Sequence, residues 1–96
     1  MDIELLSYLK RSVQRIRILN CFGSIHSPSE ISRKCRLSPS HVSRTLKEFC
    51  KKGLLECMTP NSHTGRLFQL SKSGEEMQNI LKGGELAEEY EKEANA

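Results

Sequence analysis

The fold is decided by residues 27–53, which read SPSEISRKCRLSPSHVSRTLKEFCKKG. This segment contains one helix-start signal twice: a serine that can cap a helix, followed by a proline that suits the first helical position. The signal begins at Ser27 and is repeated at Ser38. Glu30 adds a capping box to the first of the two starts. Two short capped helices joined by a tight turn predict a helix-turn-helix.

Apolar periodicity gives each of these two helices one buried face. In the second helix the apolar residues fall within one narrow arc, with Cys50 at its edge. This helix is expected to end at Lys51-Lys52-Gly53, where basic residues meet the negative end of the helix dipole. The side chains predicted to face inward are Ile31, Cys35, Val42, Leu46 and Phe49.

The flanking sequence predicts a helix before this segment and a β-hairpin after it. Residues 3–22 carry apolar side chains at helical spacing, and Gly23 is expected to end that helix. Residues 25–27 are expected to be a short extended piece. Residues 54–58 and 67–70 suit two strands, and the turn formers between them predict a long hairpin tip.

A closing helix is expected after the hairpin. Its signal is a capping box from Ser73 to Glu76, and a break is expected at Gly83-Gly84. Residues 85–94 are acidic and predict a further helix. The predicted inner face of the closing helix is Met77, Ile80 and Leu81.

These elements predict an α+β, mainly helical fold: a winged helix-turn-helix with a three-helix core, a two-stranded β-wing and a C-terminal helix. A chain of 96 residues supports one modest core. We therefore expect one DNA-binding domain over residues 1–82, followed by an acidic C-terminal helix or tail over residues 83–96.

Charge is unevenly distributed along the chain, although the net charge is only +3. Residues 10–72 contain 13 Lys and Arg against three Glu, whereas residues 73–96 carry a net charge of −5. A basic body indicates a polyanionic partner, and a solvated surface of mixed charge is the alternative.

The helix expected over residues 39–52 presents donors opposite its buried stripe, so we expect it to read double-stranded DNA from the major groove. Arg44 is the preferred base reader, since its guanidinium can pair bidentately with guanine. The wing at residues 59–66 is expected at the minor groove, with a surface Arg66 paired to Glu56 as the alternative. The expected DNA-contacting residues are Ser38, Ser40, His41, Ser43, Arg44, Lys47, Lys51, Asn61, Ser62, His63 and Arg66.

The run from His41 to Glu56 resembles the recognition helix and first wing strand of the MarR and ArsR-like winged-helix transcription regulators. The run from Gly65 to Gly74, GRLFQLSKSG, is similar to their second wing strand and the turn that follows, as found in compact archaeal members. The resemblance covers residues 27–82. It implies a homodimeric regulator, expected to be a repressor, with one recognition helix for each half-site.

Two departures from these families restrict what the resemblance implies. MarR proteins have an acidic-x-Arg-acidic wing tip and long terminal helices, whereas residues 61–66 here read NSHTGR. A MarR-style effector pocket is therefore not expected, and the paired-Cys recognition helix of metal-sensing ArsR proteins is absent. Dimerisation is expected to use the first helix and the segment around Leu86 and Tyr90.

Other functions remain as alternatives. A winged-helix protein-interaction module is the main one, although such a module more often presents apolar residues on the face that is basic here. RNA binding is a second alternative, but the aromatic residues that would stack on bases from an exposed face are missing. No nucleophile–base pair or phosphate-binding glycine loop is present, so we expect neither an enzyme nor a cofactor.

The four cysteines lack the paired spacing of metal ligands, so we expect small buried side chains in a reducing cytoplasm and no metal. A zinc site using His26, His41 or His63, and a thiol switch at Cys50 and Cys57, are the alternatives. No apolar stretch is long enough to span a membrane, and residues 1–4 do not begin a signal peptide. A cytoplasmic protein is expected.

Overall fold

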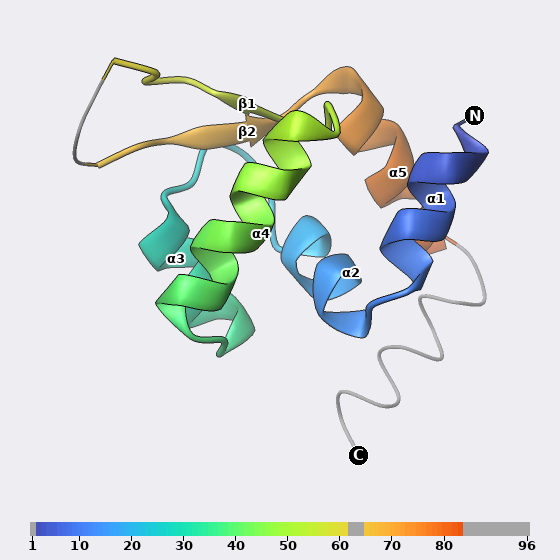
Figure 1. Ribbon diagram of the computed structural model, residues 1–96, viewed down its shortest axis with the longest axis horizontal. Coiled ribbons are helices and arrows are strands. Elements are labelled where there is room, and N and C mark those ends of the chain that lie inside the picture. The colour runs from blue at the N-terminus through green and yellow to red at the C-terminus, as the bar shows by residue number, and fades with distance from the viewer. Residues whose placement is uncertain (1, 62–64, 84–96) are drawn as a thin grey trace.

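The computed structural model describes residues 2–61 and 65–83 of the chain. These residues form five helices and a two-stranded antiparallel sheet (Figure 1). The elements, in chain order, are α1 (Ile3–Lys10), α2 (Val13–Asn20), α3 (Pro28–Cys35), α4 (Pro39–Lys51), β1 (Leu55–Cys57), β2 (Phe68–Leu70) and α5 (Lys72–Gly83). The helix predicted over residues 85–94 lies outside the described residues.

The N-terminal helical region consists of two helices, so the prediction of one helix over residues 3–22 is wrong. After α1 ends at Lys10, the side-chain oxygen of Ser12 accepts a hydrogen bond from the backbone N–H of Arg15 at 3.3 Å and caps α2. Serine favours this start because its hydroxyl satisfies a free N–H group of the new helix. Apolar spacing does not show the break, because both helices bury apolar residues in the same core: Leu5, Leu9, Ile16, Ile18 and Leu19.

Helices α3 and α4 form the predicted helix-turn-helix, and their capping signals are confirmed. Ser27 and Glu30 make a reciprocal capping box at the start of α3, and Ser38 caps α4. In the turn, the N–H of Leu37 donates to the Ser32 carbonyl at 3.2 Å, and the Ser32 hydroxyl donates to the Leu37 carbonyl at 2.6 Å. One buried serine therefore satisfies both backbone groups of Leu37.

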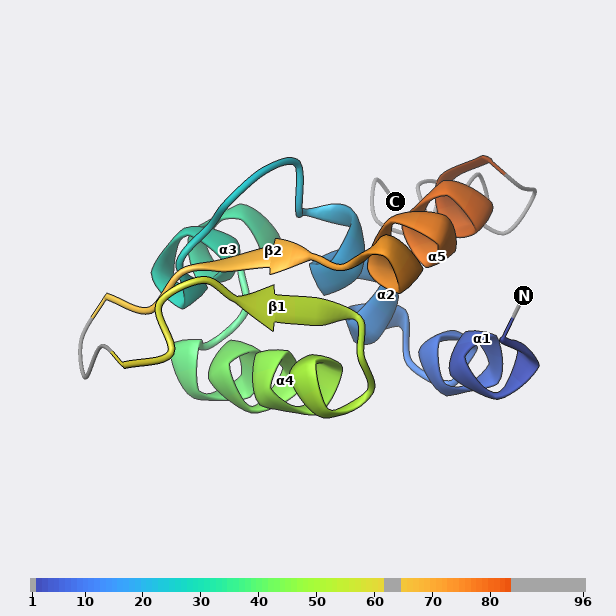
Figure 2. The ribbon, with the colours of Figure 1, turned by 90° about the horizontal axis from the view of Figure 1, so that it is seen from above.

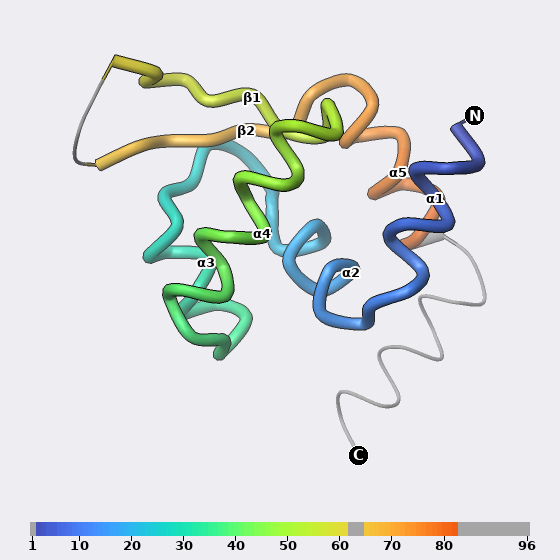
Figure 3. Tube along the Cα trace, in the orientation of Figure 1, coloured from blue at the N-terminus to red at the C-terminus, as the bar shows by residue number. Residues whose placement is uncertain are grey.

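The predicted β-hairpin is confirmed, with Leu55 opposite Leu70 and Cys57 opposite Phe68. The extended piece before α3 is also confirmed, because His26 exchanges two backbone hydrogen bonds of 2.9 Å with Phe68. The trace in Figure 3 follows the chain from α2 past β2 into α3. The described parts of the hairpin, up to residue 61 and from residue 65, extend away from α1 and α5 (Figure 2).

Helix α5 is capped by Ser71, so the predicted cap at Ser73 is wrong. The N–H of Gly74 donates to the Ser71 hydroxyl at 3.1 Å, and this hydroxyl donates to the carbonyl of Gly53 at 2.5 Å. The start of α5 thereby lies against the chain that leads into β1. A Cβ on Gly74 would collide with the carbonyl oxygen of Leu54, so only glycine allows this close approach.

The hydrophobic core lies between the helices and the inner face of the hairpin. The predicted inward position of Ile80 is wrong, because its side chain is 36% exposed while Met77 and Leu81 of the same helix are buried. Among the helices of residues 2–61 and 65–83, none is both long and apolar enough to cross a membrane. The largest fully buried side chains are Phe22, Phe49, Leu9, Ile18, Leu19, Ile31, Leu46, Leu54, Met77, Leu81, Val42 and Cys35.

Candidate nucleic-acid interface

Helix α4 turns one polar face to solvent. Its inner face is buried as predicted, and Thr45, which apolar periodicity does not mark, is buried with it because its hydroxyl donates to the His41 carbonyl at 3.0 Å. This internal hydrogen bond satisfies the hydroxyl, so a threonine can lie inward. The predicted DNA-contacting residues of α4 that are exposed are Ser40, Arg44, Lys47 and Lys51.

The N-terminal end of α4 contains the remaining predicted contacts of this helix. Ser38 is exposed, and its hydroxyl oxygen accepts the N–H of His41 at 3.3 Å, so the hydroxyl retains its proton as a donor for another partner. His41 and Ser43 are half-buried. The positive end of the helix dipole adds to the attraction of this end for a phosphate group.

The wing contributes Asn61 and Arg66, which are both exposed. Gly65 has a φ of 67°, a left-handed conformation that suits glycine in a tight turn. Arg66 lies close enough to α4 to act on the thiol of Cys50. Burial and the neighbouring Cys57 raise the pKa of this thiol, and the positive charge of Arg66 opposes the rise. The predicted contacts Ser62 and His63 lie outside the described residues.

A shallow depression of about 310 Å³ separates the start of α2 from α4. Its lining includes two predicted contacts, His41 and Arg44, together with Ser12, which caps α2, and Arg15 of α2. Ser12 and Arg15 were not predicted as site residues, because a continuous first helix gave no reason to place them beside α4. The capping Ser12 is the only local signal of this placement.

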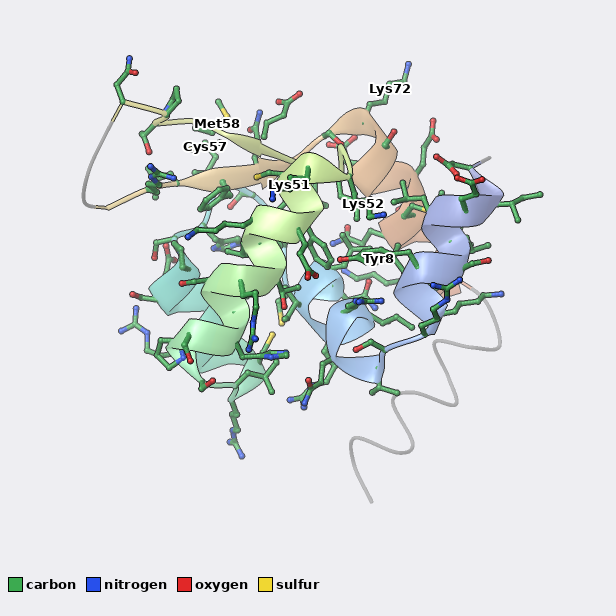
Figure 4. The ribbon with its side chains drawn as sticks, in the orientation of Figure 1. Tyr8, Lys51, Lys52, Cys57, Met58 and Lys72 are labelled. Atoms are coloured by element: carbon green, nitrogen blue, oxygen red, sulfur yellow. The ribbon has the colours of Figure 1, made fainter. Side chains whose placement is uncertain are left out.

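Tyr8 connects α1 to the C-terminal half of α4, as Figure 4 shows. Its hydroxyl donates a hydrogen bond to the Glu48 carboxylate at 2.9 Å. The Arg15 guanidinium lies 3.9 Å and the Lys52 ammonium 4.9 Å from the centre of its ring, both within reach of a cation–π interaction. Burial, followed by the hydrogen bond to Glu48, raises the pKa of Tyr8 to about 12. The sequence carries no signal for this contact, which joins residues 40 positions apart.

A second set of contacts joins the C-terminal ends of α2 and α3. The guanidinium of Arg17 donates to the carbonyl of Cys35 at 2.5 Å, and the ammonium of Lys34 donates to the carbonyl of Cys21 at 3.2 Å. Each cation therefore lies at the negative end of the other helix, where it satisfies a carbonyl that the helix leaves free. The arrangement fixes α3 beside α2.

The exposed groups described above can donate hydrogen bonds and positive charge, which are the requirements for contacts to phosphates and base edges. Within the described residues they come from the outer face of α4 and from Asn61 and Arg66 of the wing, and the half-buried Ser12 and Arg15 lie beside them at the start of α2. On the outer face of α4, Arg44 has the most versatile side chain, because its guanidinium offers five donors in a planar fork.

No protein-family model and no curated protein matches the sequence. Solved structures do match the fold. The reduced form of MarR from E. coli is similar with a TM-score of 0.69 and 22% sequence identity, over 91% of this chain and 71% of that chain. A MarR family transcriptional regulator from Silicibacter pomeroyi has a TM-score of 0.70 and 17% identity, over 95% of this chain and 62% of that chain.

A mutant of MarR from E. coli, complexed with operator DNA, has a TM-score of 0.62 and 24% identity, over 94% of this chain and 69% of that chain. These likenesses show the fold. The chain has a winged helix-turn-helix fold similar to that of these MarR structures, α+β and mainly helical, as the sequence predicts.

Proposed function

We propose that this chain is a transcription regulator that binds double-stranded DNA in a sequence-specific manner, with α4 in the major groove and the wing at the minor groove. The observation that carries the proposal is the outer face of α4, where Ser40, Arg44, Lys47 and Lys51 are exposed on the second helix of a helix-turn-helix. This is the helix that enters the groove in such folds. A MarR of similar fold, complexed with operator DNA, supports the assignment.

The residues take different roles in this proposal. Arg44 reads a base, because a guanidinium can pair bidentately with the O6 and N7 atoms of guanine. Lys47 and Lys51 lie further along the helix and neutralise phosphates, which adds affinity without sequence preference. Ser38, Ser40, His41 and Ser43 act at the groove-facing end of α4, and Asn61, Ser62, His63 and Arg66 act from the wing. This makes the chain a binding protein rather than an enzyme.

We further propose a homodimer that acts as a repressor, with one α4 in each half of a palindromic site. Exposed apolar side chains on α1, α2 and α5 support a second copy as the partner: Ile3 is 73%, Val13 50% and Ile80 36% exposed. Apolar groups that stay exposed in one chain gain free energy when a partner covers them. Sedimentation at micromolar concentration tests this, because a monomer with and without DNA would exclude the dimer.

Fluorescence anisotropy with random duplex DNA across a salt series tests DNA binding, followed by selection from a random-sequence library. Affinity that falls steeply with salt, together with an enriched palindromic motif, is the expected result. Absence of binding at low salt would exclude the DNA proposal. The protein-interaction module would then be favoured, with the exposed Ile25 and Met58 as its first candidate contacts.

A further inference from the structure

Two cysteines meet where the ends of α2 and α3 lie together. Cys21 directly follows α2, and Cys35 is the last residue of α3. Their Sγ atoms are 2.8 Å apart and share a hydrogen bond. Cys35 is 1% exposed, whereas Cys21 is half-buried and reaches solvent. The contacts from Arg17 to Cys35 and from Lys34 to Cys21 keep the two thiols in this position.

We propose that Cys21 and Cys35 form a redox site in which a hydroperoxide converts the two thiols into an intramolecular disulfide that locks α3 to α2. A disulfide bond is about 2.05 Å long, so the sulfur atoms need to approach by only about 0.8 Å. The helix-turn-helix therefore keeps its arrangement when the bond closes. The proposal does not depend on the DNA-binding function.

The two thiols have unequal roles in the reaction. The hydrogen bond from Cys35, together with the charges of Lys34, Arg17 and Lys82, lowers the pKa of Cys21 to about 7 against the opposing effect of burial. The hydrogen bond to Cys21 and burial raise the pKa of Cys35. Cys21 is therefore the thiolate that attacks, and Cys35 holds its proton until the second step.

The reaction has two balanced steps. The Cys21 thiolate attacks the peroxide, so that an S–O bond forms, the O–O bond breaks and an alkoxide or hydroxide leaves. Cys35 then attacks the resulting sulfenic acid: the S–S bond forms, the S–O bond breaks, and the leaving hydroxide takes the proton of Cys35 as water. Two thiols are oxidised to a disulfide, and one peroxide is reduced to an alcohol, or water, plus water.

A metal ion fits this pair less well than a disulfide does. Thiolates at tetrahedral zinc lie about 2.3 Å from the metal, which places two such sulfur atoms about 3.8 Å apart. The pair would have to open by about 1 Å to hold such a metal. Within the described residues, no group of three or more His, Cys, Asp or Glu side chains is placed to hold a metal ion.

The test is oxidation of the reduced full chain with hydrogen peroxide, followed by alkylation of the remaining thiols and peptide mapping. We expect loss of two of the four thiols, a peptide linked through Cys21 and Cys35 within one chain, and a rise in Tm on the order of 10 °C that dithiothreitol reverses. The rate should increase as the pH rises through about 7, the pKa of Cys21.

Two variants make the result specific. Cys21→Ser changes the half-buried member of the pair and should abolish both the linked peptide and the Tm rise. The matched control, Cys50→Ser with Cys57→Ser, should retain both. A disulfide between other cysteines or between two chains, irreversible oxidation of Cys21 alone, or a lower Tm after oxidation would overturn the proposal.

Discussion

The hydroxyl of Tyr8 in α1 donates a hydrogen bond of 2.9 Å to the carboxylate of Glu48 in α4. The Tyr8 ring also packs edge-on against Phe49 at 6.3 Å between ring centres, so one side chain combines a polar and an apolar contact with α4. These contacts attach α1 to the C-terminal half of α4, the helix that carries the proposed DNA contacts.

Tyr8→Phe should destabilise the fold by about 1 kcal/mol, because it removes the hydrogen bond and keeps the ring. The difference from the unsubstituted protein should depend on pH. The folded pKa of about 12 lies above the ordinary value of 10.0, so the contribution of the hydroxyl is complete below about pH 10 and is lost as the pH rises through 12. Urea unfolding of both proteins at several pH values measures the difference in their free energies of unfolding. A difference that is equal at pH 7 and pH 12 would contradict the prediction.

Arg44→Ala should weaken binding to the selected DNA site by about 1–3 kcal/mol and relax the preference at one base position. Lys47→Ala should instead weaken binding to all duplexes alike and reduce the salt dependence, because a phosphate contact carries no sequence information. Anisotropy with the selected site and with random duplex distinguishes the two. Equal losses on both duplexes for Arg44→Ala would exclude base reading by this residue.

Gly74→Ala should destabilise the protein by about 1–3 kcal/mol, because the new Cβ would force α5 away from the Leu54 carbonyl. Gly23→Ala is the matched control, since a Cβ there meets no atom within 4 Å. Its effect should stay within about 0.5 kcal/mol. Thermal unfolding of both variants provides the comparison, and similar losses would show that close approach is not the cause.

Ser71→Ala should cost about 1 kcal/mol, because it removes the cap of α5 and the hydrogen bond to Gly53. Ser73→Ala should have little effect, since Ser73 is exposed within the first turn. Denaturant midpoints of the two variants measure the difference. A larger loss of stability for Ser73→Ala than for Ser71→Ala would instead support the cap at Ser73 that the sequence predicts.

The features that could be predicted from sequence are those in which residues a few positions apart decide the structure. The caps at Ser27 and Ser38, the buried stripe of α4 and the hairpin depend on such local signals, and the structure has them all. The site residues of α4 follow from the same periodicity, because the face opposite a buried stripe is exposed. Their contacts with DNA remain predictions.

The features that could not be predicted depend on contacts between distant segments. Ser71 and Ser73 both suit a helix start, and the choice is made by the carbonyl of Gly53, 18 residues away. The pairing of Cys21 with Cys35 likewise depends on how α2 packs against α3. Arg15 joins the interface only because the chain turns at Ser12.

Two sets of backbone hydrogen bonds hold the base of the wing, one between the two arms of the hairpin and one to the segment that precedes α3. The carbonyl of Leu67 accepts the N–H of Met58 at 2.7 Å, while Phe68 next to it is bonded to His26, the residue before the cap of α3. These hydrogen bonds tie the hairpin to the chain that leads into α3, so we expect the described part of the wing to keep its position relative to the helix-turn-helix when DNA binds. In the proposed complex the protein keeps its shape, and the DNA adapts its groove width to the distance between the wing and α4. Duplexes whose groove width already matches this span should therefore be preferred at base pairs that no side chain touches.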